Sequence, residues 1–266
     1  MMTASAKHPL LLAWPEAAIV YDRAWLSLPD GRAGELRDLA RDLDPATLRD
    51  LPVVVFQTGS ADRGQDKAIA RWFADRELAF IAPRTHLIAG RPSYESPAPL
   101  EVYHRVHELR RLEIDYVLAR LEGDGLFDLS RLCIMGLSEG AVAAATWAPD
   151  RTCPRVIMAW SMEETYFARD LVFPAMSCTP MLNIIGGKDP FFGAHDSLAS
   201  VEQVAGHGAQ ALGYYRNSKI VIYPDAAHRV ADVQGCVEDV TMFVDRYLLE
   251  VQAQDAGPDQ QQRRTE

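Results

Sequence analysis

The chain has 266 residues, of which 48% are hydrophobic and 24% are charged. This composition is ordinary for a globular protein and suffices for a large buried core. The net charge of −10 argues against nucleic acid or an anionic membrane as the main partner.

The N-terminal residues lack the apolar core of a signal peptide, and no stretch approaches the length of a membrane span. We therefore expect a cytoplasmic protein. The four cysteines form no C-x-x-C pair, which favours reduced thiols, with Cys133 packed inside a strand. A bridge between Cys153 and Cys178 stays open as an alternative.

The first 51 residues give weak signals. Short apolar pieces at 10–14, 17–21 and 25–28 precede a Pro-Asp-Gly turn, and they are interpreted as one or two edge strands. The leucines of residues 35–51 have a partly helical spacing that Pro45 interrupts.

From residue 52 the pattern is clearer. The β-branched run 53–56 is typical of a buried parallel strand, and strand 78–82 follows a helix expected at 65–77. Residues 83–100 form a long loop, and such loops are usually functional or mobile. An apolar stripe predicts a helix over 101–121.

Strands and helices continue to alternate after that helix. The further strands are expected at 132–135, 155–160, 181–185 and 219–223, and the further helices at 141–147, 196–211 and 237–251. This alternation predicts a doubly wound, mostly parallel sheet flanked by helices. Residues 1–251 are interpreted as a single domain, and the Gln/Asp-rich residues 252–266 as a disordered tail.

The pentapeptide Gly136-Leu-Ser138-Glu-Gly140 lies between a predicted strand and a predicted helix. This G-x-S-x-G pattern is typical of a nucleophile elbow, a strained turn that exposes the serine hydroxyl and needs small residues around it. The alternative is a glycine-rich turn whose serine only caps the helix.

Candidate partners of Ser138 follow later strands of the same predicted sheet. Asp189 comes after strand 181–185 and His228 after strand 219–223, so all three should meet at one sheet edge. A neutral imidazole activates a serine hydroxyl, and a carboxylate fixes the imidazole tautomer. The acids Glu163 and Glu164, which follow strand 155–160, stay open as replacements for Asp189. Weaker rivals are Asp196, Asp225, His195 and His207.

An oxyanion needs two N–H donors. One is expected from Glu139, directly after the serine, and the other from the loop after strand 53–56, where Ser60 is preferred and Gly59 is the alternative. The Glu139 carboxylate must then point away from the oxyanion or meet a cation that the sequence does not identify.

These motifs carry a resemblance. The Gly-Leu-Ser-Glu-Gly elbow, Gly-Gly-Lys-Asp-Pro and the Ala-Ala-His228 segment resemble the α/β-hydrolase superfamily over residues 52–250, and most resemble its dienelactone-hydrolase-like branch. The resemblance implies that Ser138 is the nucleophile, Asp189 the acid and His228 the base. Dienelactone hydrolases proper have a cysteine where this chain has Ser138, so their lactone substrate is not inherited. Thr58-Gly59 stands where His-Gly is common in the superfamily.

Only about 20 residues separate strands 155–160 and 181–185, so the resemblance implies at most a small cap. Aromatic candidates for an acyl pocket, or for packing beneath the cap, are Trp160, Tyr166, Phe167, Phe191 and Phe192. Arg84 and Arg91 are candidates to bind a substrate carboxylate, although arginines are mostly solvated.

No cofactor or metal is expected. Residues 104–108 read His-Arg-Val-His-Glu, which matches no zinc-protease motif and is interpreted as the polar side of a helix, and no nucleotide-binding motif occurs.

The sequence thus predicts a serine hydrolase of a small carboxylic ester or thioester. The alternatives are an acyltransferase or cyclase using the same three residues, or a non-catalytic ligand-binding protein of the same fold. A homodimer is left open.

Overall fold

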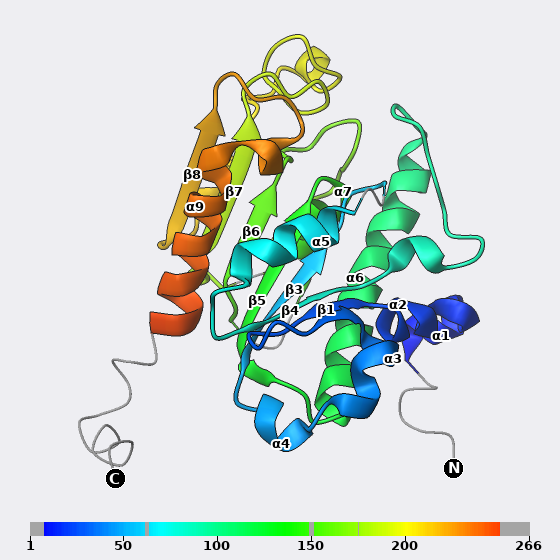
Figure 1. The fold of residues 1–266 in the computed structure, drawn as a ribbon. Helices are drawn as coiled ribbons and strands as arrows, with labels where there is room; N and C mark the ends of the chain where they lie inside the picture. The colour runs from blue at the N-terminus through cyan, green and yellow to red at the C-terminus, as the bar shows by residue number, and fades with distance from the viewer. Residues whose placement is uncertain (1–7, 62–63, 149–151, 175, 251–266) are drawn as a thin grey trace.

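The computed structural model describes residues 8–61, 64–148, 152–174 and 176–250. Within these residues, eight strands form one twisted sheet in the order β2-β1-β4-β3-β5-β6-β7-β8 (Figure 1). The strands are β1 (Trp25–Ser27), β2 (Ala33–Glu35), β3 (Pro52–Gln57), β4 (Ala79–Ala82), β5 (Asp128–Leu137), β6 (Arg155–Met158), β7 (Met181–Gly186) and β8 (Ser218–Tyr223).

The strands β4, β3, β5, β6, β7 and β8 pair in parallel with their neighbours, and β1 pairs antiparallel with both β4 and β2 at one edge. Every residue of β3 is buried, as its β-branched run predicts. The predicted mostly parallel sheet is confirmed, and the carboxyl ends of β5, β7 and β8 therefore lie along one edge.

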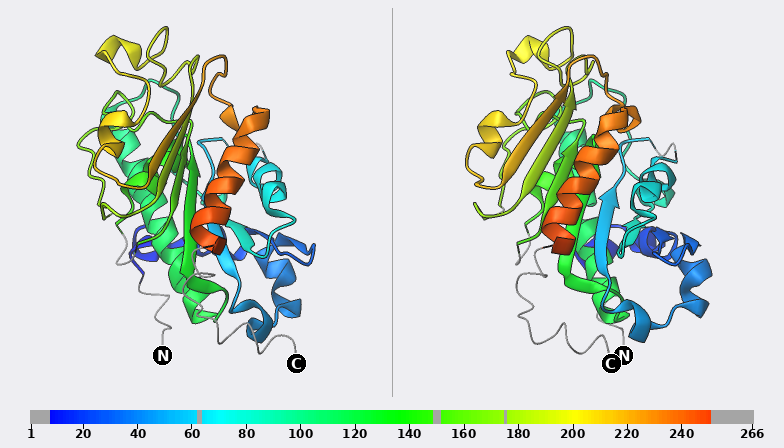
Figure 2. Two further views of the ribbon diagram at one scale, coloured as in Figure 1. Left: turned by 90° about the vertical axis from the view of Figure 1, so that its left-hand side faces the viewer. Right: turned by 60° about the vertical axis from the view of Figure 1, so that its left-hand side comes forward.

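Helices cover both faces of the sheet (Figure 2). On one face lie α6 (Leu100–Gly123) and α7 (Glu139–Thr146), whose apolar side chains pack with Val53 and Val55 of β3. On the other face lie α5 (Gln65–Ala70) and α9 (Gln234–Val244), which share a second cluster with Val54 and Phe56. Because side chains alternate along a strand, neighbouring β3 residues enter opposite cores.

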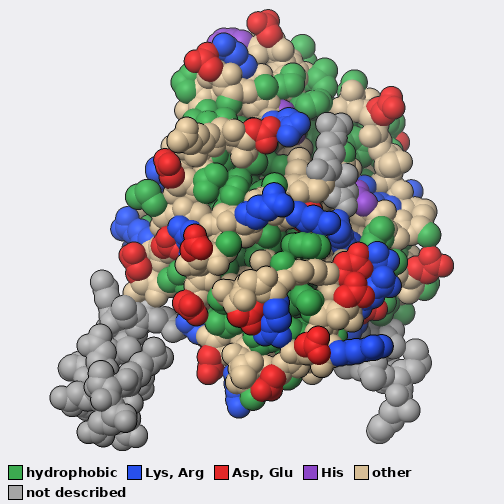
Figure 3. All heavy atoms as spheres, in the orientation of Figure 1, with side chains coloured by type: hydrophobic (Ala, Val, Ile, Leu, Met, Phe, Trp, Pro, Cys, Tyr) green, Lys and Arg blue, Asp and Glu red, His purple; other side chains and the backbone are tan. Residues whose placement is uncertain are grey.

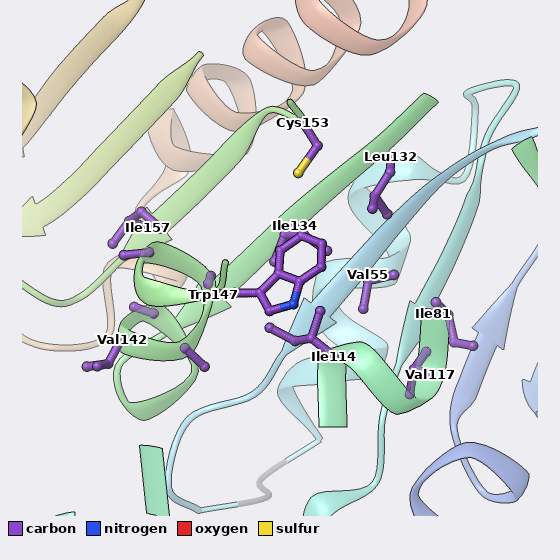
Figure 4. Close-up of a cluster of buried hydrophobic side chains, with 14 of the residues drawn as sticks. Val55, Ile81, Ile114, Val117, Leu132, Ile134, Val142, Trp147, Cys153 and Ile157 are labelled. Carbon is purple, nitrogen blue, oxygen red and sulfur yellow. The ribbon is translucent and has the colours of Figure 1, made fainter. Parts of the chain in front are cut away.

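The core under α6 and α7 is closed by Trp147, directly after α7. Figure 4 shows its indole among Val55, Ile114 and Ile134, which come from β3, α6 and β5. The indole nitrogen donates to Asp115 Oδ1 at 2.7 Å, so the polar end of the ring also has a partner.

The prediction of edge strands at 10–14 and 17–21 is wrong. These residues form α1 (Pro9–Ala13), a 3₁₀ turn (Pro15–Ala18) and α2 (Ile19–Asp22). Their buried side chains, which include Ala17, Val20 and Tyr21, recur at helical spacing and pack beside α6. Only the third apolar piece forms a strand, β1.

The connections are less regular than predicted. In place of a helix over 196–211 there are a 3₁₀ turn (Ser200–Glu202) and the single turn α8 (Ala209–Leu212). Gln203 adopts a left-handed φ of 57°, which ends the first turn. Residues 159–180, between β6 and β7, contain no helix or strand in their described part.

The remaining elements are short and lie between or after the strands and helices named above. They are α3 (Leu36–Leu39), α4 (Pro45–Leu48), 3₁₀ turns at Ala40–Asp42, Arg71–Phe73, Thr85–Leu87 and Val230–Asp232, and a π-helical segment at Asp245–Glu250. Residues 252–266, predicted to be a disordered tail, lie outside the described residues. No helix in the described part is long and apolar enough to cross a membrane.

Candidate active site

Ser138 occupies a sharp turn between β5 and α7. Its φ of 55° and ψ of −115° are rare for a residue with a side chain, so the turn is strained. The structure therefore has the strand-turn-helix setting that the G-x-S-x-G motif predicts.

The two glycines of the motif permit this turn. A Cβ on Gly136 would lie 2.1 Å from the Gly140 carbonyl oxygen, and a Cβ on Gly140 would lie 2.2 Å from the Gln57 carbonyl oxygen. Any side chain at either position would overlap with backbone. The elbow is thus packed against the end of β3, which carries the loop expected to supply an oxyanion donor.

His228 joins Ser138 to Asp189. His228 Nε2 lies 2.9 Å from Ser138 Oγ, and His228 Nδ1 lies 2.8 Å from Asp189 Oδ2. The other Asp189 oxygen accepts from the backbone N–H of Phe191 at 2.8 Å and of Phe192 at 3.1 Å. Since Asp189 is fully buried and held by these donors, its carboxylate has a fixed orientation toward the imidazole.

The two glutamates kept open as alternative acids bind elsewhere. Glu163 accepts from the backbone N–H of Ala205 at 2.7 Å and of Gly206 at 2.9 Å, and Glu164 accepts from Leu171 N–H at 3.1 Å. Asp225, a further rival, pairs with Lys188 at 2.7 Å. Asp189 is the acid that contacts His228 in the structure.

The expected oxyanion donors lie beside Ser138. Glu139 is the first residue of α7, where a backbone N–H has no partner within the helix. Gly59 is adjacent to the serine, since a Cβ built on it would lie 3.6 Å from Ser138 Cβ. Gly59 and Ser60 line the same cavity as Ser138. The structure thus places Glu139, Gly59 and Ser60 around Ser138, and it does not choose between Gly59 and Ser60 as the second donor.

The Glu139 carboxylate points away from the cavity into a fully buried position, where it meets two arginines. Arg91 Nη2 forms a short ion pair with Glu139 Oε1, and Arg110 Nε lies 3.7 Å from the same oxygen. Arg110 Nη1 also lies 3.3 Å from Glu113. These four residues, Arg91, Arg110, Glu113 and Glu139, form the buried charge cluster, and they supply the cation that the sequence did not identify.

A signal for this cluster is present in the sequence. Arg110 and Glu113 fall on the helical stripe of Val106 and Val117, at positions where an apolar side chain is expected. Both are fully buried on α6. Charged residues on an otherwise apolar stripe are rarely buried unless paired, so they indicate a partner across the core.

A cavity of about 370 Å³ opens above Ser138 and His228. Its aromatic lining consists of Trp72, Tyr94, Tyr166, Phe167, Phe191 and Phe192. The Phe191 ring packs edge-on against the His228 imidazole, with ring centroids 4.7 Å apart. Burial raises the pKa of Tyr94, and the nearby Glu139 carboxylate adds to the rise, so the phenol stays neutral.

Two residues expected to bind substrate lie elsewhere. Trp160 is fully buried in the core and packs beside Phe173, with ring centroids 6.4 Å apart. Arg84 forms an ion pair with the buried Asp66 at 3.0 Å and does not line the cavity. Arg91 pairs with Glu139 in the buried charge cluster. Of the aromatic candidates for an acyl pocket, Tyr166, Phe167, Phe191 and Phe192 line the cavity, and Trp160 does not.

The His-Arg-Val-His-Glu stretch of α6 is not simply the polar side of the helix. His104 is exposed, but His107 is buried, and the centroids of the His107 and Phe167 rings lie 5.0 Å apart. Burial lowers the pKa of His107 to about 3, so its imidazole is neutral. Among the described residues, no group of three His, Cys, Asp or Glu side chains is placed to hold a metal ion.

Comparison by sequence finds no matching family model and no matching curated protein. Comparison by structure finds many solved chains. Esterase PE8 aligns with a TM-score of 0.54 and 16% identity, over 75% of this chain and 94% of that one. A putative dienelactone hydrolase from Klebsiella pneumoniae aligns with a TM-score of 0.52 and 19% identity, over 75% and 87% of the two chains.

A phospholipase/carboxylesterase from Dyadobacter fermentans aligns with a TM-score of 0.52 and 16% identity, over 84% of this chain and 96% of that one. At these identities the likeness concerns the fold. The predicted fold class is confirmed: the chain has the α/β-hydrolase fold, and dienelactone-hydrolase-like proteins are among its structural relatives.

Proposed function

We propose that this protein is a serine hydrolase that cleaves a small carboxylic ester or thioester through an acyl-serine intermediate. The observation that carries the proposal is the hydrogen-bonded chain from Ser138 through His228 to the buried Asp189, with contacts of 2.9 and 2.8 Å. Several proteins of similar fold are named esterases or carboxylesterases, which supports the same reaction class.

The proposed reaction begins with attack of Ser138 Oγ on the substrate carbonyl carbon while His228 Nε2 takes the hydroxyl proton. Asp189 accepts from His228 Nδ1–H, which keeps the Nε2 lone pair toward Ser138 and stabilises the imidazolium. The N–H groups of Glu139 and Ser60 hold the negative oxygen of the tetrahedral intermediate.

His228 then passes its proton to the departing alcohol or thiol, and the acyl group stays on Ser138. Water enters, His228 removes a proton from it, and a second tetrahedral intermediate collapses to the free carboxylic acid and the restored serine. The cavity of about 370 Å³ and its aromatic walls fit a small apolar acyl or leaving group.

The test is Ser138→Ala with p-nitrophenyl acetate as the probe substrate. The variant should lose turnover by on the order of 10⁴-fold or more while its circular dichroism and melting temperature stay near those of the parent. A matched control is Ser130→Ala, which changes an exposed serine earlier on β5 and should keep full activity.

A fluorophosphonate probe gives an independent readout, because it should label the parent protein at Ser138 and leave Ser138→Ala unlabelled. Turnover retained by Ser138→Ala would contradict the proposal. A parent protein that neither turns over the ester nor reacts with the probe would contradict it as well, and would favour a ligand-binding role.

A further inference from the structure

Arg110 on α6 contacts both sides of the proposed oxyanion hole. Its Nη2 donates to the Thr58 carbonyl oxygen at 2.6 Å, and Thr58 directly precedes Gly59 and Ser60. Its Nε lies 3.7 Å from Glu139 Oε1, on the residue that supplies the other expected donor. One guanidinium therefore bridges the loop after β3 and the first turn of α7.

The bridge has little freedom to move. Arg110, Glu113 and Glu139 are all fully buried, and the Arg91 side chain is only 9% exposed. A guanidinium is a planar fork that directs its donors at fixed angles, which a lysine ammonium does not. The Nη2 hydrogen bond fixes the guanidinium relative to the Thr58 carbonyl, and the contact with Glu139 is an ion pair at 3.7 Å without a hydrogen bond. In a close-packed interior, the Arg110 side chain therefore keeps these two elements at a set separation.

Charge also matters at this position. The Glu139 carboxylate lies one residue from the nucleophile, where the reaction develops negative charge on the substrate oxygen. An unpaired carboxylate there would oppose that charge and would itself be costly to bury. Arg91 and Arg110 lie against Glu139 and Glu113, so two arginines face two acidic side chains in the buried charge cluster, and burial raises the pKa of Glu113.

Arg91 extends the cluster to the cavity wall. It belongs to the loop between β4 and α6, and its Nε donates to Thr85 Oγ1 at 3.2 Å. The same loop contributes Tyr94 and Ser96 to the cavity lining. The ion pair with Glu139 therefore holds this wall of the cavity against the elbow.

We propose that Arg110 is a positioning residue that sets the spacing between the two oxyanion donors, the N–H groups of Glu139 and of the Gly59–Ser60 loop. It touches no substrate, and it acts through the Thr58 carbonyl and the Glu139 carboxylate. This inference rests on the proposed function. Misplaced donors weaken binding of the transition state more than binding of the ground state, so loss of Arg110 lowers kcat and leaves KM nearly unchanged.

The test compares Arg110→Met with Arg155→Met. Arg155 is a matched control because it is also fully buried, and it donates to the carbonyls of Ala144 and Ala145 at the other end of α7. With p-nitrophenyl acetate, Arg110→Met should lose about 10²-fold in kcat with KM within about threefold, whereas Arg155→Met should keep kcat within about threefold.

The inhibition constant of phenylboronic acid distinguishes a positioning role from a purely structural one, because a structural role would leave this constant unchanged. The boronate forms a tetrahedral adduct with the serine, so its inhibition constant should rise with Arg110→Met in parallel with the loss in kcat. The inhibition constant for Arg155→Met should match the parent value. A conservative variant, Arg110→Lys, should keep the positive charge but lose the planar guanidinium. Its kcat and its inhibition constant should fall between those of Arg110→Met and the parent.

A kcat for Arg110→Met within about threefold of the parent, or an equal loss in Arg155→Met, would overturn the positioning role. If Arg110→Met does not fold, Arg110→Lys decides by the same criteria: a loss of about tenfold in kcat with unchanged KM supports the role, and parental kcat overturns it. The proposed function fails separately, when the parent protein itself shows no turnover that depends on Ser138.

Discussion

Glycine at position 140 determines how closely the elbow approaches β3. Its missing side chain leaves room for the Gln57 carbonyl at 2.2 Å and the Thr58 carbonyl at 2.6 Å from where a Cβ would stand. These carbonyls are backbone atoms at the end of a central strand and cannot move away without disturbing the sheet. The same contact holds the loop of Gly59 and Ser60 next to Ser138.

Replacing Gly140 by alanine should therefore destabilise the protein by about 3 kcal/mol or more, because the overlap is with rigid backbone. Gly123, at the end of α6, is a matched control, since a Cβ there would meet nothing within 4 Å. Gly123→Ala should raise stability by about 0.5–1 kcal/mol. Urea unfolding of both variants checks the pair, and equal stabilities would contradict the steric account.

Helix α7 is short and rich in alanine, and this composition suits its position. Ala141, Ala143, Ala144 and Ala145 are all fully buried between the sheet and α6. Small side chains let a helix approach its neighbours closely, and close approach brings the Glu139 side chain within reach of Arg110 on α6. The helix that follows Ser138 is thus packed against both the sheet and α6.

Helix α6 carries a neutral buried histidine that should make stability depend on pH. Burial lowers the pKa of His107 from 6.5 to about 3, with smaller contributions from Arg111, His104 and Arg110. The unfolded chain then binds this proton at higher pH than the folded chain does. The contribution of the neutral His107 to the free energy of unfolding is fully present above pH 6.5 and is lost as the pH falls toward 3.

His107→Phe removes the titrating imidazole, and a phenyl ring suits a site beside Phe167 and Tyr103. Between about pH 7.5 and pH 4.5 the variant should lose roughly 3 kcal/mol less stability than the parent. Urea unfolding at both pH values measures the difference. His104→Gln, at an exposed position of the same helix, should behave like the parent, and an identical pH dependence in His107→Phe would refute the assignment.

Over the whole molecule, the layered fold separates a buried interior from a mixed surface. Figure 3 shows acidic and basic side chains interspersed over one face. None of the four cysteines forms a disulfide: Cys133, Cys153 and Cys236 are buried and Cys178 is exposed. The alternative bridge between Cys153 and Cys178 is not formed in the structure.

This arrangement predicts the reactivity of the thiols. Burial raises the pKa of Cys133 well above its usual range and that of Cys236 to about 12, so neither forms a thiolate near neutral pH. Ellman's reagent should react rapidly with one thiol, Cys178, and with all four only after denaturation. Cys178→Ser should abolish the rapid phase, and fewer than four thiols in the denatured, unreduced protein would indicate a disulfide.

Some features followed from local sequence alone. The β-branched run of β3 and the alternation of strands with helices predicted the mostly parallel sheet, because side-chain periodicity encodes which faces are buried. The carboxyl ends of parallel strands lie at one edge, so the residues that follow them meet there. That rule grouped Ser138, Asp189 and His228, which are in hydrogen-bond contact in the structure.

Other features depended on tertiary packing. The apolar pieces before residue 22 become helices because they bury their side chains beside α6, and such short pieces do not distinguish a strand from a helix. Trp160 turns into the core and Arg84 turns to Asp66, since a residue's position after a strand does not fix the direction of its side chain.

The buried charge cluster shows the same division. Arg110 and Glu113 lie on the apolar stripe of α6, but the partner of Glu139 could not be read from its neighbours in sequence. Arg91 and Arg110 reach it from a distant loop and a distant helix, which meet only when α6 packs over α7. The local pattern determined the turn that holds Ser138 and which faces are buried. Tertiary contacts alone decided which charges surround Glu139, because long-range pairing depends on how the layers come together.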